Sequence, residues 1–120
     1  MIAESDCVCA APGGQATRHS VNAQALGALG PQGFLVNICR GSVVDTEALA
    51  TALREGRIAG AGLDVYESEP ARPEVLVGLE NLILTPHLAG WSPEATQASF
   101  ERFLRNAAGH FSGRGVVNPF

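Results

Sequence analysis

Four short apolar runs alternate with helix-like stretches along the 120 residues, and this alternation constrains the fold more than any other feature. The runs cover residues 6–11, 34–38, 59–65 and 81–84. Apolar runs of this length that end in turn residues are typical of buried strands in a parallel sheet. Parallel neighbours need a long crossover connection, which is usually a helix. The pattern therefore predicts an α/β fold with an open parallel sheet wound right-handedly.

Capping residues predict where the two crossover helices begin and end. Asn22 and Asp45 belong to the residue types that cap helix N-termini. We expect the first helix to span residues 22–29 and the second to run from Asp45 to about residue 54. Gly56 stands where a helix often ends in the left-handed conformation.

A longer amphipathic helix is expected near the end of the chain. Ser92 and Pro93 form a strong helix start, with an N-cap followed by proline at the first helical position. From there apolar residues recur at helical spacing as far as Phe111. With no internal repeat and no low-complexity linker, the sequence indicates one domain or part of one.

Composition fits a globular chain and argues against several kinds of partner. Hydrophobic residues make up 46% of the chain and charged residues 17%, a balance that allows a packed core. All eight basic residues are arginine, and they are scattered along the sequence. Because they form no basic patch, we expect no nucleic-acid partner, and no apolar run approaches the length of a membrane span.

The cysteines Cys7, Cys9 and Cys39 are expected to be buried small apolar side chains. Cys7 and Cys9 lie two apart on a predicted strand and share one face, an arrangement that rarely makes an unstrained disulfide. A zinc site would need more ligands at characteristic spacing, so we expect no metal. An odd cysteine count without a signal peptide favours a reducing, cytoplasmic setting.

Arg40, Glu69 and His87 each follow a predicted strand, and ligands of open parallel sheets bind beyond the carboxyl ends of the strands. An arginine can bind a carboxylate with two hydrogen bonds. A histidine exchanges a proton near neutral pH, and a carboxylate beside it orients the ring. Together the three side chains suit reduction of a 2-keto acid, with the hydride supplied by a cofactor.

Each of these residues also has an ordinary structural explanation. Arg40 could be a surface ion-pair partner, Glu69 a solvated loop residue and His87 a satisfied structural histidine. Taken singly, the ordinary explanation is the commoner one. Their occurrence at successive strand ends is what favours a catalytic site.

Specific motifs surround the three residues. They are Leu35-Val36-Asn37-Ile38-Cys39-Arg40-Gly41, Gly60-Ala61-Gly62-Leu63-Asp64-Val65-Tyr66, Glu69-Pro70 and Thr85-Pro86-His87-Leu88-Ala89-Gly90. In these motifs, and over nearly its whole length, the chain resembles the D-isomer-specific 2-hydroxyacid dehydrogenases of the glyoxylate and hydroxypyruvate reductase kind. The resemblance implies a partial Rossmann-like, doubly wound parallel sheet: the second half of a dinucleotide-binding domain, with a long C-terminal helix.

The resemblance also implies roles for individual residues. Arg40 would anchor the substrate carboxylate, Glu69 would pair with the histidine, and His87 would be the general acid and base. The residues implied to contact NAD or NADP are Ala11, Pro12, Cys39, Arg40, Asp64, His87 and Gly90. The implied substrate is a small 2-keto or 2-hydroxy acid, and the implied parent protein is a homodimer.

The glycine-rich phosphate loop of dinucleotide-binding folds is missing from the sequence. No Gly-x-Gly-x-x-Gly occurs, and Gly60-Ala61-Gly62 leads into a continuing strand rather than a helix. In the family this loop and the substrate domain lie upstream. We therefore expect residues 1–120 to be the C-terminal part of an NAD(P)-binding domain.

Three functions stay open from the sequence. The first is an NAD(P)-dependent dehydrogenase of D-2-hydroxy acids, present as a fragment or truncated form. The second is a non-catalytic, dinucleotide-sensing interaction module, because the same fold is reused in transcriptional corepressors. The third is an inactive truncated gene product, whose exposed strand edge and apolar faces would promote self-association.

Overall fold

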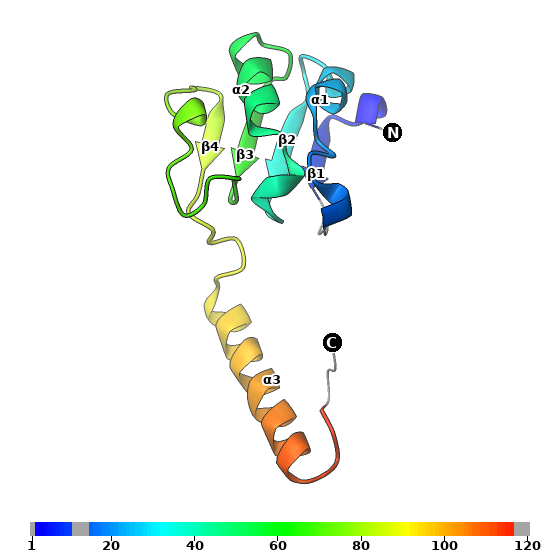
Figure 1. Ribbon diagram of the computed structural model, residues 1–120, viewed down its shortest axis with the longest axis vertical. Helices are drawn as coiled ribbons and strands as arrows, with labels where there is room; N and C mark the ends of the chain where they lie inside the picture. Colours follow the sequence, from blue (N-terminus) through cyan, green and yellow to red (C-terminus); the bar gives the residue numbers. More distant parts are fainter. Residues whose placement is uncertain (1, 11–14, 117–120) are drawn as a thin grey trace. The chain divides into compact units, whose positions relative to one another are not determined.

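The structure, a computed structural model, describes residues 2–10 and 15–116 of the chain. It divides into two units, Met1–Leu88 and Ala89–Phe120, which we take in turn. The first unit is built on a sheet of four parallel strands in the order β1-β2-β3-β4 (Figure 1). The strands are β1 Cys7–Ala10, β2 Phe34–Asn37, β3 Gly60–Leu63 and β4 Leu82–Leu84. The predicted parallel sheet is confirmed.

Two α-helices cross over between the strands and cover one face of the sheet (Figure 1). The helices are α1 Ala23–Leu29 and α2 Thr46–Arg54, and the short 3-10 turns are η1 Ile2–Glu4, η2 Gln15–Thr17, η3 Gly41–Val43 and η4 Glu74–Leu76. Because consecutive strands are neighbours in this part of the sheet, crossovers of one hand place both helices on the same side.

The predicted helix caps are confirmed. The Asn22 side chain accepts hydrogen bonds from the backbone N–H groups of Gln24 and Ala25 at 3.0 and 3.1 Å. The Asp45 carboxylate accepts one from the N–H of Ala48 at 3.0 Å. Gly56 follows α2 with φ of 63°, the left-handed conformation expected there.

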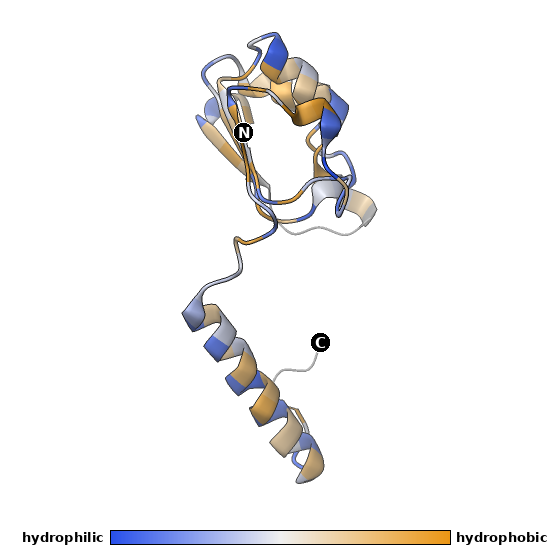
Figure 2. Ribbon diagram, turned by 90° about the vertical axis from the view of Figure 1, so that its left-hand side faces the viewer, coloured by the Kyte–Doolittle hydropathy of each residue, from blue (hydrophilic) through white to orange (hydrophobic). Residues whose placement is uncertain are grey.

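The hydrophobic core of the first unit lies between these helices and the sheet (Figure 2). Leu26 of α1, Leu49 of α2 and Leu35 of β2 are at most 1% exposed. Leu35 pairs with Ala61 of β3, whose small side chain leaves room for the helices above. Side chains at alternate positions of each strand therefore point into this core or away from it.

The opposite face of the sheet stays open within the described part of this unit. Phe34 and Ile83 are 51% and 71% exposed there. Cys7 pairs with Phe34 in the strand register and Cys9 with Val36, so both cysteines share this face and are exposed. The prediction that Cys7 and Cys9 are buried is therefore wrong, because no helix among the described residues of this unit covers their side of the sheet. The prediction is confirmed for Cys39.

The second unit consists mainly of one helix, α3 Pro93–Phe111, as predicted. The Ser92 side chain caps it by accepting a hydrogen bond from the N–H of Ala95 at 3.0 Å. Its apolar stripe is exposed within the unit; Phe103 and Phe111, for example, are 66% and 87% exposed. Neither this helix nor any other in the described residues is long and apolar enough to cross a membrane.

Candidate functional site

Glu69 and His87 form a hydrogen-bonded pair in the first unit. Glu69 lies in the loop after β3 and His87 in the turn after β4. One carboxylate oxygen of Glu69, Oε2, lies 3.0 Å from Nδ1 of His87. The other, Oε1, accepts a hydrogen bond from the backbone N–H of Tyr66 at 2.7 Å. With both oxygens engaged, the carboxylate has a fixed orientation toward the imidazole.

The turn that carries His87 is tied to the end of β3. His87 has φ of 56°, a left-handed conformation that non-glycine residues seldom adopt. Its N–H donates to the carbonyl of Asp64 at 2.9 Å. The buried carboxylate of Asp64 accepts hydrogen bonds from the N–H of Leu88 at 2.8 Å and from the Thr85 hydroxyl. These contacts hold an unusual backbone conformation in place and fix where the imidazole stands.

Asn37 shapes the turn that carries Arg40. Its side chain is fully buried at the end of β2. Its Oδ1 accepts the N–H of Cys39 at 3.1 Å, and its Nδ2 donates to the carbonyl of Arg40 at 3.0 Å. The sequence signal for this role was a polar residue inside an apolar run, which a buried strand tolerates only when the polar group is hydrogen-bonded.

Arg40 stands at the next strand end along the sheet but is not joined to the pair in the structure. Its guanidinium Nη1 donates to the carbonyl of Cys39 at 2.7 Å, within its own turn. The side chain is exposed. Arginine has five N–H donors, so this contact leaves others for an incoming carboxylate.

A pocket of about 420 Å³ opens beside the imidazole. It is lined by Tyr66, Glu69, Pro70, Pro86 and His87. Sites for small ligands have volumes of this order and combine apolar walls with a few placed polar groups. The pair therefore faces a space that a small organic acid can enter.

The other described residues predicted to belong to the site do not line this pocket. Cys39 is buried in the Arg40 turn, and Asp64 lies under the His87 turn. Gly90 belongs to the second unit. Ala11 and Pro12 lie outside the described residues. Among the residues that the structure describes, no group of three His, Cys, Asp or Glu side chains is arranged to hold a metal ion.

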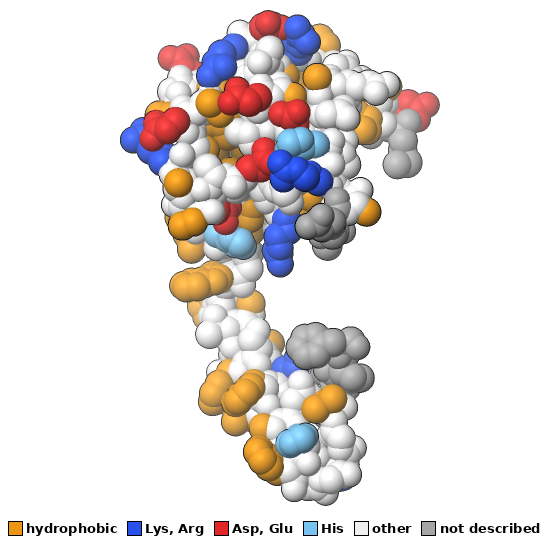
Figure 3. Space-filling model, in the orientation of Figure 1, with side chains coloured by type: hydrophobic (Ala, Val, Ile, Leu, Met, Phe, Trp, Pro, Cys, Tyr) orange, Lys and Arg blue, Asp and Glu red, His pale blue; other side chains and the backbone are white. Residues whose placement is uncertain are grey.

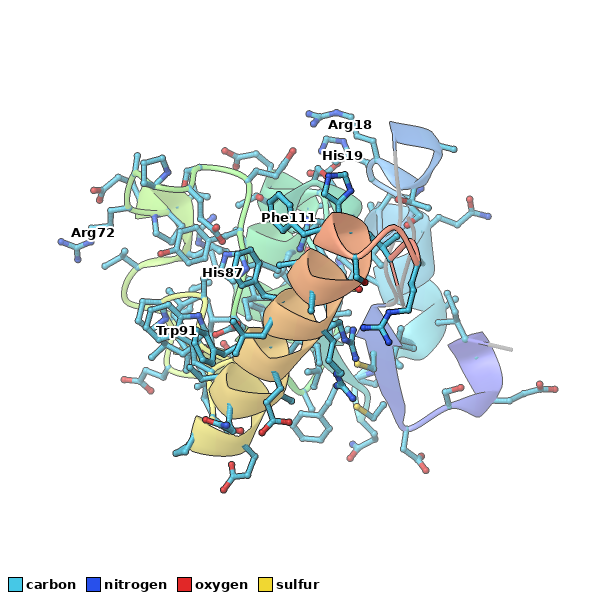
Figure 4. All side chains as sticks on the ribbon, turned by 90° about the horizontal axis from the view of Figure 1, so that it is seen from below. Arg18, His19, Arg72, His87, Trp91 and Phe111 are labelled. Carbon is cyan, nitrogen blue, oxygen red and sulfur yellow. The ribbon has the colours of Figure 1, made fainter. Side chains whose placement is uncertain are left out.

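Glu67, two residues before Glu69, sits at the centre of a polar cluster that the sequence analysis did not single out. Its Oε1 lies 2.8 Å from Nε2 of His19 and 3.1 Å from Nη2 of Arg18. Its Oε2 accepts hydrogen bonds from the hydroxyl and the N–H of Thr46, at 3.0 and 3.4 Å. Arg18 and His19 lie side by side in Figure 4, and Figure 3 shows the mixed charges of this face. The cluster consists of Glu67, Arg18, His19 and Thr46.

The pKa of Glu67 lies below its ordinary value of 4.5. Partial burial raises the pKa of this carboxyl, but the hydrogen bonds from His19 and Thr46 together lower it by more. The folded protein therefore holds Glu67 in its charged form more strongly than the unfolded chain does.

The lowered pKa of Glu67 predicts how acid affects the stability of the fold. Because the folded pKa is the lower one, the carboxylate stabilises the fold above about pH 4.5, and its contribution is lost as the pH falls through the folded pKa. We expect the melting temperature of the Glu67→Gln variant to fall less between about pH 5 and pH 3 than that of the unchanged chain. Thermal melts over this range measure the difference. Parallel curves for the two proteins would contradict the prediction.

A family model described as D-isomer specific 2-hydroxyacid dehydrogenase, NAD binding domain, matches residues 1–89. The glyoxylate reductase of Pyrococcus furiosus is 48% identical over 120 residues, which are 99% of this chain and 35% of that protein. The glyoxylate/hydroxypyruvate reductase A of Arabidopsis thaliana is 46% identical over 112 residues, 93% of this chain and 36% of that protein. The chain thus spans about a third of the length of these curated relatives.

Solved structures show the same likeness. The NADPH-dependent glyoxylate/hydroxypyruvate reductase of Sinorhizobium meliloti, solved in complex with NADP and malonate, matches with a TM-score of 0.91 and 42% identity. That match covers 99% of this chain and 38% of the other. A D-mandelate dehydrogenase of Rhodotorula graminis matches with a TM-score of 0.90 and 29% identity. These matches confirm the predicted fold class.

Proposed function

This chain belongs to the D-isomer-specific 2-hydroxyacid dehydrogenase family, and on that premise we propose that it supplies the catalytic half of an NAD(P)-dependent reductase of small 2-keto acids. One observation carries the proposal: the Glu69–His87 pair faces a pocket at the carboxyl end of the sheet. Arg40 follows the adjacent strand β2. A carboxylate-binding cation after β2, a carboxylate after β3 and a proton donor after β4 stand at the same edge of the sheet and match the needs of one small substrate.

In the proposed reaction, His87 gives a proton to the carbonyl oxygen while that carbon receives a hydride. Because Glu69 holds Nδ1, the proton leaves from the other ring nitrogen, Nε2. The Glu69 carboxylate compensates the charge of the imidazolium before transfer. Arg40 pairs with the substrate carboxylate and keeps the keto group at the imidazole. The product is the 2-hydroxy acid, and in the reverse direction His87 accepts the proton.

The bound nicotinamide dinucleotide supplies the hydride. The residues present fit only part of such a cofactor, because the sequence has no glycine-rich turn to hold a pyrophosphate. We propose that Asp64, Cys39 and Gly90 lie on the nicotinamide side, and Ala11 and Pro12 along the adenosine side. In the curated relatives, about two thirds of the protein lies outside the segment that this chain matches. Glyoxylate and hydroxypyruvate are the favoured substrates, and the free cysteines fit a reducing, cytoplasmic setting.

Turnover is tested in a graft, in which these 120 residues replace the matching segment of the Sinorhizobium meliloti reductase. The two backbones correspond over 99% of this chain, so the junctions of the graft fall at the ends of the matched segment and the rest of the reductase surrounds it. We expect the graft to oxidise NADPH when glyoxylate or hydroxypyruvate is added. A dinucleotide-sensing module would bind NADPH in the graft without consuming either acid.

The isolated chain should bind dinucleotides only weakly. In dinucleotide-binding folds, backbone N–H groups of a glycine-rich loop and a helix N-terminus bind the pyrophosphate and contribute much of the affinity. This sequence has no such glycine-rich loop. We expect calorimetric titration of the isolated chain with NADH or NADPH to show no saturation at cofactor concentrations that saturate the graft. Tight binding by the isolated chain would overturn the assignment of these residues to half of a cofactor site.

A further inference from the structure

We propose that Glu67 is a positioning residue: its carboxylate fastens the loop after β3 to two neighbouring loops and thereby sets the geometry of the Glu69–His87 pair. This inference rests on the proposed function, since it assigns Glu67 a part in the same site. Glu67 acts through Glu69 and is assigned no contact with substrate or cofactor.

The Glu67 cluster joins three segments that are far apart in sequence. Arg18 and His19 come from the connection before α1, and Thr46 begins α2. Glu67 itself belongs to the loop after β3. Oε1 of Glu67 contacts Arg18 and His19, and Oε2 accepts a hydrogen bond from Thr46. One side chain therefore cross-links the loops on the carboxyl side of β1, β2 and β3.

The two neighbouring segments form a firm support because they are hydrogen-bonded to each other. The N–H of His19 donates to the carbonyl of Ser42 at 2.9 Å, and that of Val21 donates to the carbonyl of Val43 at 3.1 Å. Val21 and Val44 also form an isolated parallel bridge. Glu67 is thus anchored on a short two-stranded ladder rather than on two independent loops.

A short path leads from Glu67 to the catalytic pair. The N–H of Tyr66, the residue before Glu67, donates to Glu69 Oε1 at 2.7 Å, and the N–H of Glu69 donates back to the carbonyl of Tyr66 at 3.3 Å. Gly41, beside Arg40, packs directly against the Tyr66–Glu67 peptide. A shift of Glu67 would therefore move the peptide that orients the Glu69 carboxylate.

The loop after β3 depends on the contacts of Glu67 because the residues that follow Glu67 are exposed. Ser68, Glu69 and Pro70 are all exposed, so little apolar burial holds them. Glu67 has only 23% of its side chain exposed, with Arg18 and His19 at one carboxylate oxygen and Thr46 at the other. An ionised side chain with several hydrogen-bonded partners can hold such a loop where packing cannot.

The test measures the ring nitrogen signals of His87 by NMR in the isolated 120-residue chain, where no turnover is needed. The Glu69→Ala variant, which has no side-chain acceptor for Nδ1, gives the reference for loss of this hydrogen bond. We expect Glu67→Gln to move the Nδ1 resonance of His87 at least halfway toward that reference, and Thr46→Val to move it less in the same direction. Glu74→Gln, at an exposed acid of η4, is the matched control and should leave the resonance unchanged.

A merely structural role for Glu67 would lower the melting temperature without moving the His87 resonance. That result in folded Glu67→Gln, or in Thr46→Val if the first variant does not fold, would overturn the proposal. Failure of the proposed function has a different signature: a graft that binds NADPH but does not reduce keto acids, whatever the His87 ring signal shows.

Discussion

Replacing His87 with glutamine in the graft is expected to lower kcat for reduction of glyoxylate by roughly 100- to 10,000-fold, the range that general acid–base catalysis contributes. Glutamine is polar and fills similar space, but its amide cannot exchange a proton near neutral pH. The proton for the carbonyl oxygen would then have to come from water. The initial rate of NADPH oxidation under saturating glyoxylate measures the effect.

Two further measurements make this result specific to the proposed role. Binding of NADPH by the His87→Gln graft is measured separately, and kcat is compared at saturating NADPH, so that a lost cofactor contact is distinguished from lost proton transfer. His110→Gln, at an exposed histidine near the end of α3, is the matched control and should leave kcat unchanged. A His87→Gln graft with more than about a tenth of the parent kcat would contradict a general acid role.

Gly41→Ala is expected to destabilise the isolated chain by roughly 1–3 kcal/mol, with the upper end favoured. An added Cβ at Gly41 would overlap the backbone of Tyr66 and Glu67. Backbone cannot move aside as a flexible side chain does, so the loop that carries Glu69 would have to shift. Denaturant unfolding followed by circular dichroism measures the change in the free energy of unfolding.

Gly27→Ala is the matched control for this prediction. Gly27 lies inside α1, and a Cβ there would meet no atom within 4 Å. Because alanine favours a helix interior over glycine, this variant should stabilise the chain by roughly 0.5–1 kcal/mol. If the two variants changed stability in the same direction, the close contact between the Arg40 turn and the Glu69 loop would not be present in solution.

Local signals in the sequence predicted the elements well. Asn22, Asp45 and Ser92 each cap a helix through contacts within three residues of the cap. Gly56 adopts its left-handed conformation because the helix end itself requires it. Features of this kind depend on neighbours in sequence, so pattern alone identifies them.

Features that depend on distant parts of the chain were missed. Cys7 and Cys9 are apolar in pattern, yet no described element of the first unit covers their face of the sheet. Glu67 looked like an ordinary loop acid, because its partners His19 and Thr46 lie 48 and 21 residues away. Such contacts are created by the fold and leave no periodic signal in the sequence.

The candidate site was predicted in its residue types but only partly in its geometry. The pairing of Glu69 with His87 is seen in the structure. The contact of Arg40 with its own turn was not foreseen, because a long flexible side chain can reach backbone acceptors that the sequence pattern does not reveal. Asn37 supports that turn from the end of β2; a polar residue in an apolar run signals a hydrogen-bonded side chain, but only the structure identifies its partners.

The most direct test of the central claim is the rate at which the graft oxidises NADPH with glyoxylate, measured beside its Arg40→Gln and His87→Gln variants. If Arg40, Glu69 and His87 form the catalytic half of a keto-acid reductase, the graft turns over, and each substitution lowers kcat/KM by at least about 100-fold. A folded graft that binds NADPH but reduces neither glyoxylate nor hydroxypyruvate would contradict the claim.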